Sequence, residues 1–494
     1  MALAKNSAKL ESFDVAVVGA GIIGLTIAYE ISLRSPETRV AVVSPLQLDG
    51  IASNAAGAML SAHGETTTSS FATEAARLKS RLRLEAARLW PEWCAKLSEH
   101  CPRVALQPRS GTVVIANAIS GPCDERNFQA ICDAAKGDGA RLEAISAEEV
   151  QGLNPQTQCR PLRAIYLPGE QYIDAAQVLG ALSTFLSAQP NIALIDASCL
   201  GVKANAADGI HTLETKVGSI RSHVIVLAAG ASTASLIECL GHGAGRIPKL
   251  FCGTGTAFVC DTPAGGPSIN VAIRTPNRAF ACGLHVLPFM RDGLYVGATN
   301  NVQVDPIVSP VLGDLGFLIE CATHQVDRRL YTSAVRNTLT GNRPVTADTF
   351  PLLGETSIRG IWIATGTYRD GFLMAPLLAC KLVDALDRGD AVLAGAEIFR
   401  PERPPLPVVR DMATAIAEGV ENYVSAAFER NAHLPTAGSW ESEFRMVLEQ
   451  RVSRIYAQLA SPFLLPPDLL WDAERGALGP AMADYYRSAD LAWR

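Results

Sequence analysis

The feature that most constrains the fold lies near the start of the chain, where residues 19–24, Gly-Ala-Gly-Ile-Ile-Gly, form a G-x-G-x-x-G pattern. An apolar run at 14–18 precedes the pattern, residues 25–33 have the composition of a helix, and a second apolar run follows at 40–43. This strand–helix–strand spacing, about thirty residues long, is typical of a unit that binds the pyrophosphate of a dinucleotide. The sequence therefore predicts a Rossmann-type nucleotide-binding domain.

The glycines of the pattern have separate physical roles. Gly19 makes the tight turn, Gly21 lets the backbone approach the pyrophosphate, and Gly24 lets the helix pack close to the strand. The helix N-terminus supplies unpaired N–H groups and the positive end of the helix dipole for the phosphates. The cofactor contacts predicted for this turn are Gly19, Gly21, Ile22, Ile23 and Gly24.

One part of the dinucleotide pattern is missing. The acidic residue expected about 20 residues beyond the last glycine, which would hold a ribose hydroxyl, is replaced by Ser44. A serine hydroxyl can still make one hydrogen bond, and Asp49 lies close by in the sequence. No Lys or Arg occurs between residues 40 and 49, so nothing there indicates a 2′-phosphate. Pyrophosphate binding alone does not separate NAD from FAD.

Three later segments favour a flavin. Residues 53–60 are mostly small, so their backbone could lie against a flat ring, although composition alone is equally compatible with a surface loop. An apolar run at 224–229 ends at Gly230 and is typical of a buried strand. A third apolar run at 361–364 leads into an apolar helix from about residue 372 to 386. A helix N-terminus aimed at a flavin would stabilise the negative charge of the reduced ring.

Composition narrows the class of function. The 43 Lys+Arg and 49 Asp+Glu give a net charge of −6, which argues against a protein that coats nucleic acid or anionic membranes. The 12 cysteines contain no C-x-x-C pair, so we interpret them as reduced thiols and predict no metal site. The chain has no stretch approaching the ~18 apolar residues of a membrane span and no signal-peptide core at its start. We expect a soluble, cytoplasmic protein that acts on a small molecule.

Taken in order, these segments resemble the glycine oxidase and D-amino acid oxidase family of FAD-dependent amine oxidoreductases. The resemblance covers about residues 13 to 390, and an Ala-His-x-Glu pattern at 62–65 is most similar to glycine oxidase. The motifs that carry it are GAGIIG at 19–24, SNAAGAML-SAHGE at 53–65, VIVLAAG at 224–230, GNRP at 341–344 with Asp348 and PLLG at 351–354, and ATGTYRDGFLMAP at 364–376.

The resemblance implies an α/β (α+β) fold with a Rossmann-type FAD-binding domain, an inserted mixed-sheet substrate domain and a helical C-terminal extension. Apolar stripes at 412–424 and 444–459 predict two amphipathic helices in the extension. These helices could pack on the chain's own core or across a homodimer, cover the site, or bind a partner protein. The expected domains are 12–75, 165–245 and 335–398 for FAD, 76–164 and 246–334 for the substrate, and 399–494 for the extension.

The resemblance also implies four substrate-binding residues. Arg343 stands where the family's arginine clamps the substrate carboxylate, and Arg369 matches a position facing flavin and substrate; a surface ion pair is the alternative for each. His285 takes the place of an active-site tyrosine and could titrate near neutral pH, the alternative being a hydrogen-bonded histidine on a sheet. The neighbours of His63, Ser61 and Gly64, match residues near the site entrance in glycine oxidase, the alternative for His63 being a solvated loop residue.

No cysteine matches the covalent flavin link of the sarcosine oxidases, so we expect non-covalent FAD. Beyond the glycine turn, the predicted cofactor contacts are Ser44, Ser53, Ala56, Gly57, Ala58, Cys199, Gly230, Gly366, Asp370, Gly371, Phe372 and Leu373.

The activity that the resemblance implies is oxidative deamination of a small amino acid or related amine acid, of the glycine or D-amino acid type. The substrate would lose its α-hydrogen as hydride to flavin N5, the imine would hydrolyse, and oxygen as acceptor would give hydrogen peroxide. No side chain is assigned as a catalytic acid or base. Two alternatives stay open: a dehydrogenase passing electrons to a quinone or protein partner, and a flavin-binding subunit without turnover. A homo-oligomer is compatible with each.

Overall fold

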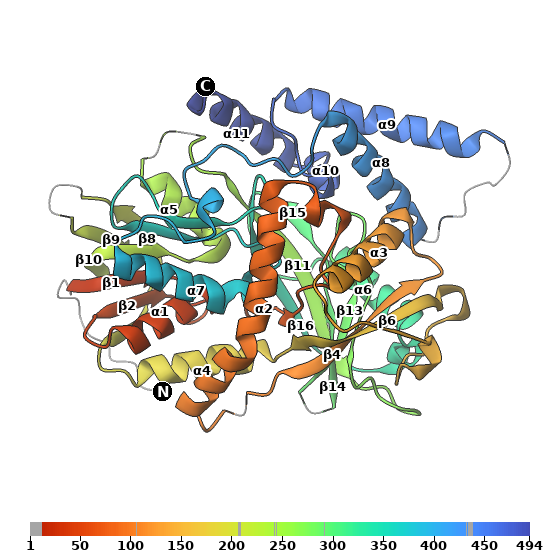
Figure 1. Ribbon diagram of the computed structural model, residues 1–494, viewed down its shortest axis with the longest axis horizontal. Helices are drawn as coiled ribbons and strands as arrows, with labels where there is room; N and C mark the ends of the chain where they lie inside the picture. Colours follow the sequence, from red (N-terminus) through yellow and green to blue (C-terminus); the bar gives the residue numbers. More distant parts are fainter. Residues whose placement is uncertain are drawn as a thin grey trace.

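The computed structural model describes residues 12–494 except 105, 206–208, 242, 244, 291, 431 and 433–437. Two large sheets lie beside each other, and a group of C-terminal helices lies across one end of both (Figure 1). The predicted α/β (α+β) fold class is confirmed. None of the helices in the described part of the chain has both the length and the apolar character needed to cross a bilayer.

The first sheet is the nucleotide-binding sheet. Its central strand β1 (Ser12–Val18) pairs in parallel with β2 (Val40–Ser44) and with β10 (Gly218–Leu227). Both faces are covered: Val15 and Val17 belong to one core cluster, and Ala16 and Val18 to another. Burial on both faces explains why the strand is a continuous apolar run. The remaining strands are β7 (Ile192–Asp196), β18 (Ile361–Thr365) and β17 (Leu352–Glu355), with β9 (His211–Thr215) paired to β10 and β8 (Cys199–Lys203) paired to β9.

Four helices cover one face of this sheet and share one apolar core. In that core α2 packs against α7 and α4, and its Trp90 donates a hydrogen bond from Nε1 to the carbonyl oxygen of Leu373 at 2.7 Å. Figure 1 shows α2 standing between the two sheets. The four helices are α1 (Ile22–Arg34), α2 (Glu74–His100), α4 (Ala175–Ser187) and α7 (Gly371–Arg388), and α5 (Thr233–Cys239) lies on the other side, beside β8.

The second sheet is mixed, and its longest pairing joins β11 (Leu250–Asp261) to β16 (Val335–Thr346) in antiparallel register. That register places Arg343 of β16 opposite Gly253 of β11. The helices α3 (Pro122–Gly137) and α6 (Leu312–Gln325) pack against this sheet in two separate cores. The other strands are β3 (Met59–Leu60), β4 (Arg109–Asn117), β5 (Glu143–Ile145), β6 (Pro161–Tyr172), β12 (Ala272–Arg274), β13 (His285–Phe289), β14 (Gly293–Gly297) and β15 (Asn301–Gln303).

Both sheets are discontinuous in sequence. The first takes strands from 12–44, 192–227 and 352–365, and the second from 59–60, 109–172, 250–303 and 335–346. The chain therefore passes between them several times, which brings loops from both sheets to one boundary. The exact domain limits stay a prediction.

The C-terminal extension packs on its own chain. Its helices α8 and α9 bury Val424 and Leu448 in a core that also contains Phe251 and Val345 of the second sheet. The buried face of α8 differs from the predicted apolar stripe. Met412, the first residue of the stripe, is exposed, and Tyr423, which was not part of the stripe, is buried. The helices are α8 (Met412–Glu429), α9 (Trp440–Leu459), α10 (Leu470–Ala473) and α11 (Leu478–Ala492), the upper group in Figure 1.

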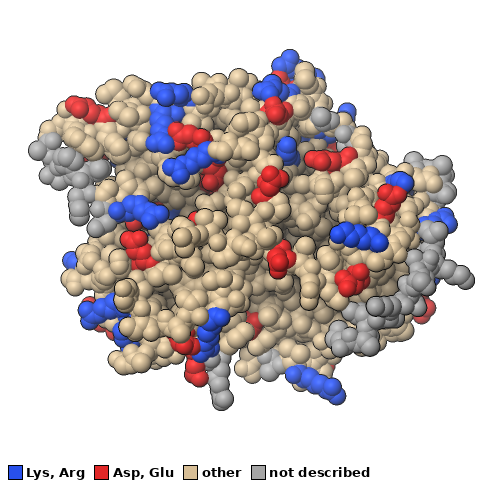
Figure 2. Space-filling model, turned by 180° about the vertical axis from the view of Figure 1, so that it is seen from behind, with Lys and Arg blue, Asp and Glu red and all other residues tan. Residues whose placement is uncertain are grey.

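Charges are dispersed on the molecular surface. On the face shown in Figure 2, basic and acidic side chains alternate over a largely uncharged surface. The described atoms of this face form no broad basic area of the kind that binds nucleic acid. This agrees with the small net charge of −6.

Candidate active site

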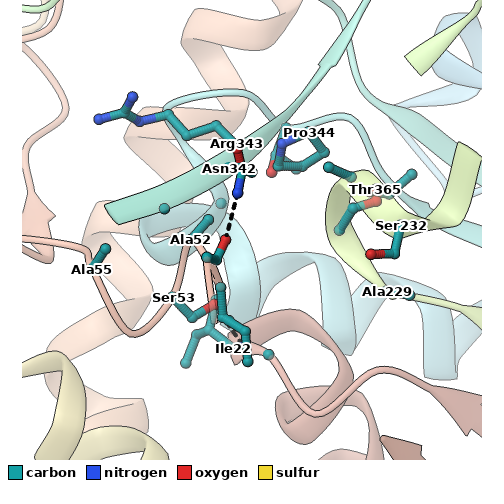
Figure 3. A pocket seen from close by; sticks show the side chains of 18 of the residues that line it. Ile22, Ala52, Ser53, Ala55, Ala229, Ser232, Asn342, Arg343, Pro344 and Thr365 are labelled. Carbon is teal, nitrogen blue, oxygen red and sulfur yellow. Dashed lines mark hydrogen bonds between the residues drawn. The ribbon is translucent and has the colours of Figure 1, made fainter. Parts of the chain in front are cut away.

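A cavity of about 720 Å³ lies where the two sheets meet. Its walls include the residues that follow β1, β2, β10 and β18, which are the carboxyl ends of parallel strands. Open α/β sheets bind ligands at this edge. Figure 3 shows Ile22 and Ser53 on one side of the cavity, Ala229 and Ser232 on another, and Arg343 extending toward Ala55.

The glycine turn has the geometry that the pattern requires. Gly19 has φ +113°, and a Cβ there would lie 2.5 Å from the carbonyl oxygen of Ala228. A Cβ on Gly24 would lie 2.0 Å from the carbonyl oxygen of Gly19, so Gly24 serves close helix packing and does not line the cavity. The N-cap Gly21 has no side chain, so Ile22 and Ile23 present backbone to the cavity without a local cap.

The small-residue loop is tied to the start of α1. The backbone N–H of Ile22 donates to Ser53 Oγ at 3.0 Å, which fixes the loop over the helix N-terminus (Figure 3). Farther along, the Tyr295 hydroxyl of β14 donates to the carbonyl oxygen of Ala55 at 2.9 Å. These two bonds hold the loop along the cavity wall. Its predicted contacts Ser53, Ala56, Gly57 and Ala58 all line the cavity.

The N-terminus of α7 also opens into the cavity. Its N-cap Asp370 does not cap the helix with its side chain but pairs with Lys79 Nζ at 3.1 Å and Arg83 Nε at 3.0 Å, both from α2. The first backbone N–H groups of α7 thus stay available for an electron-rich ligand atom. Of the contacts predicted here, Asp370, Gly371, Phe372 and Leu373 line the cavity, and Gly366 does not.

The remaining predicted nucleotide contacts lie at the end of β2, after β10 and at the start of β8. Ser44, Cys199 and Gly230 all line the cavity. Asp49 lines it as well, so a carboxylate is available near the position where the usual acidic residue is replaced by serine.

Arg343 is a cation that makes no ion pair with any residue the structure describes. Its Nη1 donates to the carbonyl oxygen of Thr299 at 3.1 Å and to Asn300 Oδ1 at 3.3 Å. A Cβ on Gly255 would lie 2.4 Å from Nη1, so the absence of a side chain there makes room for the guanidinium. No carboxylate of the described residues lies within ion-pair distance of Arg343. Its remaining N–H groups are free to bind an anion in the cavity.

His285 is buried in the cavity wall and stacks on Tyr295, with ring centroids 5.7 Å apart. Its Nδ1 lies 3.1 Å from the carbonyl oxygen of Gly283, which can only accept, so Nδ1 carries the hydrogen and Nε2 keeps a lone pair. Burial, aided by the positive charge of Arg274, lowers the pKa of His285 to about 4. The expectation that this side chain titrates near neutral pH is therefore wrong; it is neutral there.

An ion pair that the sequence did not predict lies beside His285. Glu65, at the end of the Ala-His-x-Glu pattern, lines the cavity and accepts from Arg274 Nη1 at 2.5 Å. Burial alone would raise the pKa of Glu65, but the charge and hydrogen bond of the fully buried Arg274 outweigh it and lower the pKa to about 2. Glu65 is thus ionised and already neutralised.

Arg369 continues a hydrogen-bonded row that begins at Arg343. Asn300, which accepts from Arg343, donates from Nδ2 to the Tyr368 hydroxyl at 2.6 Å. The same hydroxyl accepts from Arg369 Nη2 at 3.0 Å. Arg369 lies 3.8 Å from Asp468 Oδ2 of the C-terminal extension. The structure thus brings both predicted arginines to one end of the cavity.

His63 is not in the cavity wall. Its Nε2 lies 2.9 Å from Asp138 Oδ2, and its backbone N–H donates to Glu170 Oε1 at 2.9 Å. Glu170 also accepts hydrogen bonds from Ser61 and Gly64, so it fixes the turn that carries the Ala-His-x-Glu pattern at 62–65. His63 therefore stabilises this turn, and a role at the site entrance stays a prediction.

Comparison with known proteins agrees with this geometry. Residues 14–385 match the FAD dependent oxidoreductase family, which includes the D-amino acid oxidases, and the chain belongs to that family. It is an FAD-dependent amine or amino acid oxidoreductase of the glycine oxidase and D-amino acid oxidase type.

Individual relatives are distant. Glycine oxidase of Geobacillus kaustophilus is 26% identical over 380 residues, which cover 76% of this chain and 93% of that protein. Its crystal structure superposes with a TM-score of 0.66 at 24% identity, covering 80% of this chain and 99% of that one. D-amino acid dehydrogenase 2 of Ralstonia nicotianae is 26% identical over 271 residues, 52% of this chain and 61% of that protein.

The residues present fit FAD, the family's cofactor. The turn at Gly19 leaves no side chain over the end of β1. The N-cap residues Gly21 and Asp370 do not cap α1 and α7 with their own side chains, and of the first N–H groups of α1 the one of Ile22 is bonded to Ser53 Oγ, so the remaining N–H groups of both helix N-termini can face electron-rich groups. The cavity also runs continuously from Cys199 to Arg343. Such a shape suits a long cofactor with space for a small acid at its far end.

Proposed function

We propose that this protein oxidises the C–N bond of a small amino acid or related amine acid of the glycine or D-amino acid type. One observation carries the proposal: Arg343, a guanidinium without a carboxylate partner among the described residues, lines the same cavity as the nucleotide-binding turn. A planar guanidinium matches a carboxylate with two parallel hydrogen bonds and stays charged at any working pH.

The backbone carbonyl of Thr299 and the side chain of Asn300 orient the carboxylate-binding group. Both accept from Nη1 of Arg343, so one edge of the guanidinium is fixed and the other edge is left for the substrate. Holding the carboxylate in one place orients the α-carbon, and orientation supplies a large share of the rate in reactions of this kind.

The substrate amine would lie near His285. His285 and Gly57 both line the cavity, and the Nε2 atom of His285 lies 3.2 Å from the point where a side chain would begin on Gly57. We infer that the Nε2 lone pair is accessible to a substrate in the cavity. A neutral imidazole accepts a hydrogen bond from the amine without taking up its proton at neutral pH, because its pKa is about 4. The amine reacts as the neutral form, so this contact binds and orients it.

Bound FAD would serve as the two-electron acceptor, and the imine left by loss of hydride from the α-carbon would be hydrolysed by water to an oxo acid and ammonia. With oxygen as the final acceptor the second product is hydrogen peroxide. The second candidate is a dehydrogenase that passes electrons to a quinone or a protein, and the similarity to D-amino acid dehydrogenase 2 supports it.

The test is a product assay on the purified flavoprotein. We expect an oxo acid together with ammonia from glycine or one member of a D-amino acid panel, or together with methylamine from sarcosine, in equal amounts with the oxygen consumed. Turnover that needs an added dye or quinone and consumes no oxygen would favour the dehydrogenase. No product from any amino acid with either acceptor would contradict the proposal.

A further inference from the structure

The C-terminal extension places one carboxylate beside an arginine at the substrate end of the cavity. Asp468, in the helical turn Pro467–Leu469, lies 3.8 Å from Nη2 of Arg369, which lines the cavity. Family similarity ends at residue 385, so this carboxylate comes from a part of the chain beyond the family region.

Neighbouring contacts fix this part of the extension. Asp472 Oδ2 accepts from the backbone N–H of Val302 at 2.7 Å, and Trp471 stacks on Phe280 with ring centroids 6.0 Å apart. Both partners belong to the substrate side of the molecule, beside Asn300 and Cys282 of the site. Asp468 is therefore positioned by the packed extension.

The charges at this end of the cavity are nearly balanced. Glu65 is neutralised by Arg274, and Arg369 faces Asp468, while Arg343 has no acidic partner among the residues that the structure describes. Arg343 and Arg369 belong to one hydrogen-bonded row through Asn300 and Tyr368. Without Asp468, two uncompensated guanidiniums would lie at the same end of the cavity.

We propose that Asp468 is a specificity-determining residue that restricts the site to acids with a single carboxylate. A second carboxylate on the ligand would have to displace Asp468 from Arg369 or lie beside it, and either arrangement disfavours binding through like-charge repulsion or lost pairing. The inference rests on the proposed function, because it takes Arg343 as the group that binds the first carboxylate.

The test compares binding of propionate and succinate to the oxidised holoenzyme by isothermal titration calorimetry. We expect Asp468→Asn to raise affinity for succinate relative to propionate by about 10-fold, since Arg369 becomes available to the second carboxylate. Asp468→Ser serves as a second variant if the first does not yield flavoprotein. An unchanged ratio of affinities would overturn the proposal.

Two controls separate a local effect from a general one. Asp472→Asn makes the same side-chain substitution in the same segment and keeps an acceptor for the Val302 N–H, so it should leave the ratio as in the wild type. Adding Arg369→Gln to Asp468→Asn should abolish the gain. A gain in the Asp472 control, or one that survives loss of Arg369, would overturn the role of Asp468.

The titration also separates this inference from the proposed function. If propionate does not bind the wild type, the carboxylate site at Arg343 is wrong and both proposals fail. If propionate binds and the ratio does not respond to Asp468, only the specificity role fails.

Discussion

Replacing Arg343 by alanine removes a cavity cation that lacks an acidic partner within the described part of the chain. In the wild type Nη1 is held by Thr299 and Asn300, and the other guanidinium N–H groups have no acceptor among the described residues. The change therefore removes the proposed substrate contact. It leaves the glycine turn, the Ser53 contact and the α7 N-terminus intact, so we expect Arg343→Ala to retain bound FAD.

The size of the effect follows from the two hydrogen bonds that a guanidinium makes to a carboxylate. Hydrogen bonds to charged groups contribute about 1.5–3 kcal/mol each, and removing one partner of a desolvated charge pair costs about 2–5 kcal/mol in total. The expected loss in kcat/KM is therefore roughly 30- to 5,000-fold. Arg343→Lys keeps the charge but not the planar fork, so its loss should lie between wild type and alanine.

The assay is anaerobic stopped-flow reduction of the flavin over a range of substrate concentrations, with each rate normalised to bound flavin. Arg343→Ala should reduce slowly and show the original visible spectrum before substrate is added. If the variant loses flavin while each remaining flavin is reduced at the wild-type rate, Arg343 holds the cofactor and the substrate assignment is refuted.

Three further variants test other parts of the account. Ser53→Ala should weaken FAD binding about 10-fold, because the Ile22 N–H loses its partner; unchanged affinity in a fluorescence titration of apoprotein would contradict this. A pKa of about 4 for His285 means that acidification from pH 7 to 5 costs about 2 kcal/mol of stability, because the unfolded state binds the proton more tightly; urea unfolding of His285→Gln should show a smaller loss. Arg403→Met leaves the buried Asp348 carboxylate unpaired and should cost about 3–5 kcal/mol in the same assay, and a loss below about 1 kcal/mol would argue against the buried pair.

Local sequence patterns predicted the parts of the fold that depend on neighbouring residues. The glycine turn, the helix after it and the apolar helix α7 follow from spacing alone, because each glycine is needed by atoms a few residues away or by the adjoining strand. Gly24 illustrates the limit of the pattern. It is required for packing against Gly19, and it does not line the cavity.

The charged groups of the site could not be placed in this way. Glu65 and Arg274 are 209 residues apart, and Arg369 and Asp468 belong to segments that only the folded chain brings together. The pKa of His285 depends on burial, which no local pattern specifies, and so the prediction of a near-neutral pKa was wrong. Lys79 and Arg83 were missed for a similar reason, because on a long polar helix they are indistinguishable from solvated side chains.

The central claim, that one cavity brings an amino acid to FAD, is tested most directly by the visible absorption spectrum of the purified protein. The spectrum is recorded anaerobically before and after addition of glycine, sarcosine and a panel of D-amino acids. The account predicts oxidised flavin bands that bleach with at least one of these compounds in the wild type and bleach far more slowly in Arg343→Ala. Bands that no amino acid bleaches, or that bleach equally fast in both proteins, would contradict it.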